Sequence, residues 1–90
     1  MKRIWKFPVR ADAFVVEMPE GAKILGVQVQ DGEPHLWALV DEFAPKVRRK
    51  LATVGTGHPL PDEIMEGTHI GTFQLHGGAI VLHLFDFGAQ

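Results

Sequence analysis

Glycine and proline interrupt this chain so often that no segment is left in which a long helix could form. Ten glycines and six prolines are spread along 90 residues. Both residues have a low helix propensity, whereas they are common in the turns that join short strands. We therefore expect short extended segments connected by tight turns, in a single domain that spans residues 1–90.

The clearest extended pair is a hairpin over residues 22–41 with Asp31-Gly32 at its turn. This dipeptide is typical of a type I′ turn, because both central residues of that turn have positive φ. A turn here places Gly26 opposite Trp37 and Leu25 opposite Ala38. The two faces then differ in polarity, as expected for a half-buried antiparallel pair. The predicted core face carries Leu25, Val27, Val29, Leu36, Ala38 and Val40, and the other face carries Gln28, Gln30, His35 and Trp37.

A second hairpin is predicted over residues 68–87, with Gly77-Gly78 as its turn. This register pairs Leu75 with Ile80 and places His69 and His83 on opposite faces. The predicted core face carries Phe73, Leu75, Ile80, Leu82 and Leu84, and the other face carries Thr72, Gln74, His76, Val81, His83 and Phe85. The latter face is too apolar for a freely solvated surface, so we expect it to meet a loop, a second sheet or another copy of the protein.

Three weaker strands are predicted over residues 3–9, 13–18 and 47–54, and a single helical turn over residues 61–66. Pro8 lacks an amide donor, which favours the end of a strand or a sheet edge. About seven short, mainly antiparallel strands indicate an all-β domain, built as a compact sandwich or a partly open barrel.

Charge and composition narrow the classes of partner. The net charge of −2 argues against a nucleic-acid binder, which needs a basic face. The one basic run, residues 46–50, is interpreted as a solvated strand face. No cysteine is present, so disulfides and thiolate metal sites are excluded. No signal peptide or membrane span is recognisable, which favours a cytoplasmic protein.

The segment from Val54 to Pro61 is the strongest candidate for a ligand site. Gly55 and Gly57 would let the backbone approach an anion and point amides at it, while Thr56 and His58 add side-chain donors. The alternative is a strand exit that needs unusual backbone angles. Trp37 or Gln74 would complete a site for a nucleotide-like ligand, although a tryptophan in a thin core more often packs than stacks on a base.

The five histidines do not indicate a metal site, and we expect neither a metal nor another cofactor. None of them lies in a spacing typical of zinc ligands. The chain has no serine and no tyrosine, which removes two common catalytic side chains. Thr56 beside His58 resembles a nucleophile and its base, but no third orienting group is identifiable. We therefore expect no catalytic residue.

Two polar faces are candidates for contact with a partner or with another copy. Small domains often gain buried area by self-association, so a homo-oligomer is one expectation. The residues assigned to these faces are Gln28, Gln30, His35, Thr72, His76 and His83.

Several sequence pieces, in this order, resemble a family of small proteins of unknown function that are often encoded in bacteriophages and prophages. The pieces are residues 4–8 (IWKFP), 18–25 with 27–30 (MPEGAKIL, VQVQ), 36–41 (LWALVD), 54–59 (VGTGHP), 69–78 (HIGTFQLHGG) and 81–85 (VLHLF). The resemblance covers nearly the whole chain. It implies a protein made in the cytoplasm of an infected bacterium, and it carries over no catalytic residue.

Three functions are compatible with these observations. The first is a non-enzymatic phage accessory protein that acts by binding, such as a counter-defence protein that binds a host protein or sequesters a small nucleotide-like anion. The second is a minor virion or assembly protein, in which the polar faces are subunit contacts. The third is a small metal-assisted hydrolase that acts on a phosphorylated compound.

Overall fold

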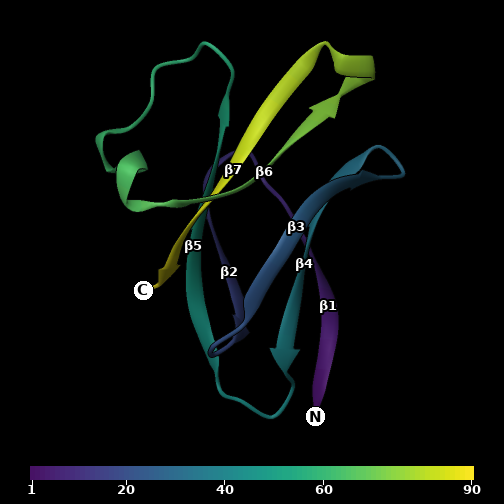
Figure 1. Ribbon diagram of the computed structural model, residues 1–90, viewed down its shortest axis with the longest axis vertical. Coiled ribbons are helices and arrows are strands. Elements are labelled where there is room, and N and C mark those ends of the chain that lie inside the picture. The colour runs from purple at the N-terminus through teal and green to yellow at the C-terminus, as the bar shows by residue number, and fades with distance from the viewer.

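Seven antiparallel strands form two sheets in the computed structural model, which describes residues 1–90 (Figure 1). The three-stranded sheet has the order β1-β4-β3, and the four-stranded sheet has the order β2-β5-β7-β6. The strands are β1 (Lys2–Pro8), β2 (Asp12–Pro19), β3 (Lys23–Gln30), β4 (Glu33–Asp41), β5 (Lys46–Gly55), β6 (Thr68–Leu75) and β7 (Ile80–Ala89). Two short 3-10 helices, η1 (Asp62–Glu66) and η2 (His76–Gly78), complete the chain.

The two sheets enclose one apolar core, and they do not close into a barrel. Buried side chains from both sheets make up this core: Val27, Leu36, Ala38 and Val40 from one, and Phe14, Met18, Leu51, Phe73 and Leu84 from the other. The predicted all-β class and the predicted helical turn are confirmed. The three weaker strands are also confirmed, each within two residues of its expected ends. Neither 3-10 helix has the length and apolar character needed to cross a membrane.

The β3–β4 hairpin has the predicted turn. Asp31 and Gly32 both have positive φ, 53° and 79°, as a type I′ turn requires. Gly26 lies opposite Trp37, as expected. The prediction for Leu25 is wrong, because a bulge between Ile24 and Gly26 places Ile24 opposite Ala38 instead. An extra residue in one strand reverses the faces beyond it, and Leu25 is consequently 49% exposed.

The β6–β7 hairpin keeps the predicted register from Leu75↔Ile80 to Thr72↔His83. A second bulge, between His69 and Gly71, shifts the pairing beyond that point. The prediction that His69 and His83 point to opposite faces is therefore wrong. Their ring centroids lie 6.2 Å apart on one side of the sheet. Ile80 is also more exposed, at 41%, than a core residue would be.

The basic run is not uniformly solvated, because Arg49 points inward. Its Nε and Nη2 donate to the two carboxylate oxygens of Asp86 on β7, at 3.0 Å and 2.7 Å. Nη1 donates to the carbonyl oxygen of Ala22 at 2.8 Å. The side chains of Arg49 and Asp86 are only 16% and 10% exposed. The interpretation of the run as a solvated face is thus wrong at Arg49, while Lys46 and Arg48 are exposed as expected.

Candidate functional site

The segment that joins β5 to β6 borders two cavities. It leaves β5 at Gly55, turns at Gly57, passes through η1 and enters β6 at Thr68. In Figure 1 it is the long green loop on the side of the molecule away from β1. Within η1 only Ile64 is buried, and this side chain anchors the loop against the rest of the domain.

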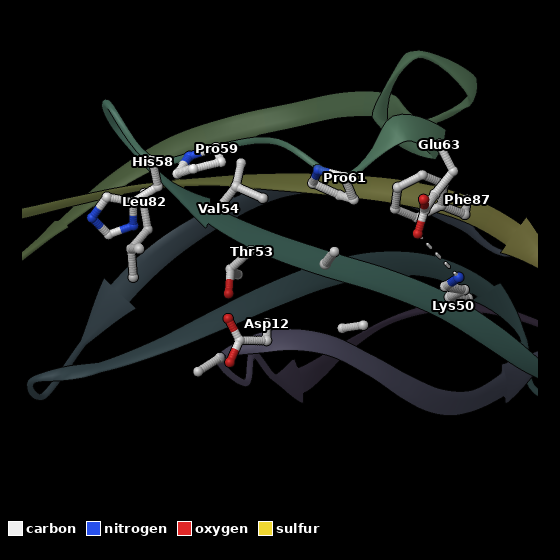
Figure 2. A pocket seen from close by; sticks show the side chains of 14 residues that line it. Asp12, Lys50, Thr53, Val54, His58, Pro59, Pro61, Glu63, Leu82 and Phe87 are labelled. Atoms are coloured by element: carbon white, nitrogen blue, oxygen red, sulfur yellow. Dashed lines mark ion pairs between the residues drawn. The ribbon is translucent and has the colours of Figure 1, made fainter.

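The larger cavity, about 420 Å³, lies between this loop and β5, and we call it the proline cavity. Figure 2 shows it running along β5, with His58 and Leu82 at one end and Lys50, Glu63 and Phe87 at the other. Its lining residues are Ala11, Asp12, Ala13, Lys50, Ala52, Thr53, Val54, Gly55, His58, Pro59, Pro61, Glu63, Leu82 and Phe87.

The Lys50 end of the proline cavity combines charge with an aromatic ring. Lys50 Nζ lies 4.0 Å from Glu63 Oε1 and 5.5 Å from the centroid of the Phe87 ring. Both charged side chains are partly exposed, so this ion pair is weak and can be displaced by a ligand. The cavity therefore offers apolar walls with polar groups at both ends, a combination typical of small-molecule sites.

The smaller cavity, about 300 Å³, lies beside the same loop over β7, and we call it the histidine hollow. It is lined by Val54, Gly55, Thr56, Gly57, His58, Leu60, His83 and Phe85. Val54, Gly55 and His58 line both cavities, so these three residues separate the two spaces. The structure thus gathers the predicted residues Gly55, Thr56, Gly57 and His58 around one pair of cavities. It also confirms that part of the hairpin face that carries His83 and Phe85 meets a loop.

Glycine is required at two positions of this loop for different reasons. A Cβ at residue 55 would lie 2.6 Å from Nδ1 of His58, so the absence of a side chain is what lets the His58 ring lie over β5. Gly57 has a φ of +82°, in the left-handed region that side-chain-bearing residues avoid.

The amides of the loop offer less to an anion than the sequence suggests. Thr56 N–H donates to the carbonyl of Val81 at 3.2 Å, and His58 N–H donates to that of Gly55 at 3.2 Å. Of these consecutive amides only that of Gly57 makes no backbone hydrogen bond. Anion binding here therefore rests on one amide and on the side chains of Thr56 and His58.

A chain of four side chains lies along the floor of the histidine hollow and over β6. Thr56 Oγ1 lies 2.7 Å from Nε2 of His83, and Thr72 Oγ1 lies 2.9 Å from Nδ1 of the same ring. Thr72 Oγ1 also lies 3.4 Å from Nε2 of His69. The centroid of the His69 ring lies 5.2 Å from that of the Phe85 ring. Both nitrogens of His83 are thus paired with hydroxyl groups.

This chain includes a partner for Thr56 that sequence reasoning missed. In the sequence His58 is the histidine nearest to Thr56, but His83 is the histidine that contacts it. The contact depends on pairing of Val54 with His83 across β5 and β7, and the turn signals in the sequence do not predict pairing between strands so far apart in the chain. Lys50, Glu63 and Phe87 were missed for the same reason. No group of three or more histidine, cysteine, aspartate or glutamate side chains is arranged to hold a metal ion.

The remaining predicted residues lie elsewhere. Trp37 and His35 stand on the outer face of the three-stranded sheet, with ring centroids 6.3 Å apart, and neither lines a cavity around the loop. Gln74 and Thr72 line a shallow groove between β6 and β3, opposite Gln28. Two further residues lie at hairpin ends: Gln30 accepts a hydrogen bond from Lys6 Nζ at 2.7 Å, and His76 begins the exposed turn η2.

A protein-family model described as a domain of unknown function (DUF7352) matches residues 1–89. This agrees with the resemblance of the sequence to a family of unknown function. No curated protein matches the chain, and no solved structure does.

Proposed function

Because the chain belongs to the DUF7352 family, whose function is unknown, we propose from its geometry that it acts by binding a small nucleotide-like anion without transforming it. The observation that carries this proposal is the pair of adjoining cavities that share Val54, Gly55 and His58. We further propose, from the sequence pieces quoted above, that the protein is a phage or prophage accessory protein that works in the bacterial cytoplasm. Sequestering a nucleotide signal of the host would be one such role.

The proline cavity suits the planar, apolar part of the ligand. Val54, Pro59 and Phe87 provide apolar surface, and flat rings of a base pack favourably against such groups. At the far end of the cavity, Lys50 and Glu63 offer a donor and an acceptor for the polar edge of the base. The volume of about 420 Å³ falls within the range typical of small-molecule sites.

The anionic part of the ligand fits the loop side of His58. The stretch from residue 51 to residue 61 contains no carboxylate, so no like charge on this segment opposes an anion there. The Gly57 amide and the His58 ring are the available donors, and the Thr56 hydroxyl joins them in the His83 tautomer in which Nε2–H donates to Thr56. All three belong to exposed residues, so a phosphate at this point would keep part of its hydration.

Native mass spectrometry of the full chain with a panel of mononucleotides and cyclic dinucleotides tests the proposal, and calorimetry gives the Kd. We expect a stoichiometric complex with at least one panel member, recovered unmodified. His58→Ala should weaken binding by about tenfold, equivalent to about 1.4 kcal/mol. His35→Ala is the matched control, because His35 lines neither cavity. If the panel leaves no bound mass, or if both histidine variants bind as the wild type does, the site assignment is wrong.

An exposed apolar patch favours a second candidate function, which is binding of a host protein. On the outer face of the three-stranded sheet, Ile4 lies directly opposite Leu39, and the two are 58% and 37% exposed. Three lysines lie around this pair: Lys2 precedes Ile4 on β1, opposite Asp41, Lys6 follows it, and Lys23 lies opposite Leu39 on β3. An apolar centre with a basic rim is complementary to a partner that has an apolar patch with acidic surroundings.

The protein-partner candidate is tested with Ile4→Asp and Leu39→Asp in an affinity capture from bacterial lysate, followed by measurement of the identified partner's Kd. Both variants should lower the affinity by at least tenfold, while Val15→Asp, at an exposed position on the other sheet, should not. Equal capture by all three variants would exclude this face as the binding surface. The oligomeric state seen by native mass spectrometry reports at the same time whether copies of the chain associate.

A further inference from the structure

The contacts of Thr56 have the geometry of a nucleophile and its base. A nucleophilic hydroxyl needs a basic nitrogen within about 2.6–3.2 Å, and that base needs a third group to orient it. Thr56 Oγ1 lies 2.7 Å from His83 Nε2, and His83 Nδ1 lies 2.9 Å from Thr72 Oγ1. These two distances satisfy both conditions. Binding of an unmodified ligand does not require them.

A neutral imidazole at His83 allows two directions for the protons along the chain. Such a ring has one N–H donor and one acceptor nitrogen, so only one of its two threonine partners can donate to it. If Thr56 donates to Nε2, the Nδ1–H donates to Thr72, and the Thr72 hydroxyl is then free to donate to Nε2 of His69 at 3.4 Å. In this direction Nε2 of His83 is ready to take the proton of Thr56.

We propose that Thr56 is an acyl-accepting nucleophile, with His83 as its general base and Thr72 as the residue that positions the His83 ring. The proposal goes beyond ligand binding and does not depend on it. The substrate class is a short-chain activated ester. The histidine hollow beside Thr56 is only about 300 Å³ in volume, and its apolar lining residues, Val54, Leu60 and Phe85, suit a small acyl group.

The acyl transfer balances without any further reactant. Thr56 Oγ1 forms a bond to the acyl carbon while its proton moves to Nε2 of His83. The carbonyl oxygen becomes an oxyanion, for which the unpaired N–H of Gly57, the next residue, is the available donor. Collapse of the intermediate breaks the bond to the leaving alkoxide, which receives the proton from His83. The products are the Thr56 ester and an alcohol, and water can later release the acyl group by the same steps.

The groups involved are accessible to a substrate. Thr56 and Gly57 are exposed, and His83 is half-buried between the loop and β6. Its two hydroxyl partners come from β6 and from the residue directly after β5, so the sheet itself holds the ring in place. A site supported by strands is positioned more accurately than one on a free loop.

Incubation of the full chain with p-nitrophenyl acetate tests the proposal. Release of p-nitrophenolate gives the rate, and peptide mass spectrometry locates the acetyl group. We expect acetylation of Thr56 and its loss in Thr56→Val, which keeps the shape of the side chain. His83→Gln, which has no basic nitrogen, should slow acetylation of Thr56 by about a hundredfold. Thr68→Val is the matched control, because Thr68 is exposed on β6 and its side chain makes no hydrogen bond.

Thr72 is tested as a positioning residue by a pair of variants. Thr72→Val should slow acetylation of Thr56, and Thr72→Ser, which restores the hydroxyl, should recover the wild-type rate. Circular dichroism of each variant reports whether the sheets are intact. The proposal is refuted if the acetyl group appears only on lysines, or if folded Thr56→Val and His83→Gln release p-nitrophenolate at the wild-type rate.

Discussion

Removal of Asp86 should destabilise this domain more than removal of any exposed charge. Asp86 accepts two hydrogen bonds from Arg49 and a third, at 2.9 Å, from the amide of Gly88. In Asp86→Ala the guanidinium stays behind with only the Ala22 carbonyl and the Met18 sulfur within reach. An uncompensated charge in such a position costs about 3–5 kcal/mol. Because Arg49 keeps 16% exposure and hence some water, we expect about 3 kcal/mol.

This loss is large compared with the stability of a domain of 90 residues, which is about 5–13 kcal/mol at the usual value per residue. It corresponds to a fall in Tm of about 12–24 °C. Urea unfolding, followed through the fluorescence of Trp5 and Trp37, gives the free energy of unfolding directly. Asp86→Asn, which keeps an acceptor oxygen for Gly88, should cost less than Asp86→Ala.

The matched control is the exposed ion pair between Arg3 and Glu42, whose side chains are 53% and 21% exposed. Glu42→Ala should cost less than about 1 kcal/mol, and this cost should shrink further at high salt. A double variant, Arg49→Met with Asp86→Leu, should recover most of the lost stability, because replacing both members of a buried pair by apolar residues is often nearly neutral. If Asp86→Ala and Glu42→Ala cost the same, the pair does not act as a buried one.

Three further predictions concern the turns and bulges. Gly55→Ala should lower the stability, because the new Cβ would lie 2.6 Å from Nδ1 of His58 and would displace the His58 ring. Adding His58→Ala should restore the lost stability, and a double-mutant cycle measured by urea unfolding tests this. Gly32→Ala should cost about 1–2 kcal/mol, because the φ of +79° is strained for alanine; an unchanged unfolding midpoint would contradict the type I′ turn. Leu25→Lys should change the stability by less than about 0.5 kcal/mol, because the bulge leaves Leu25 exposed, whereas Leu36→Ala at a buried position should cost about 2–5 kcal/mol. Similar urea midpoints for these two variants would mean that the bulge in β3 is absent.

Local signals predicted the hairpins and failed at the bulges. Asp31-Gly32 sets the register of β3 and β4 as far as Gly26↔Trp37, because the turn and the neighbouring pairs are determined by adjacent residues. Neither bulge has a local signal as clear as that of the turn. The bulges turn Leu25 outward and bring His69 to the side of His83, so the face assignments are wrong at these two positions.

The loop from Val54 to Pro61 was recognisable as a candidate site because Gly55 and Gly57 allow backbone conformations and close approaches that other residues do not. Gly57, at a φ of +82°, has the unusual backbone expected of a strand exit, which is the alternative interpretation to a ligand site. The sequence does not indicate which side chains of other strands lie against this loop. His83, Phe85 and Phe87 on β7 reach the loop only because β7 lies next to β5 in the sheet.

The sequence by itself determined the all-β class, the two hairpins with their turns and the core residues Val27, Leu36, Ala38, Val40, Phe73 and Leu84, because turn chemistry and alternation of polarity act between near neighbours in the chain. Only the tertiary structure decided that β5 pairs with β7, that Arg49 points inward to Asp86 and that Thr56 contacts His83. The two side-chain contacts join residues 27 and 37 positions apart in the chain. Contacts of this range depend on how whole strands pack against one another. The free energy of this packing is a property of the assembled sheets and not of any short sequence pattern.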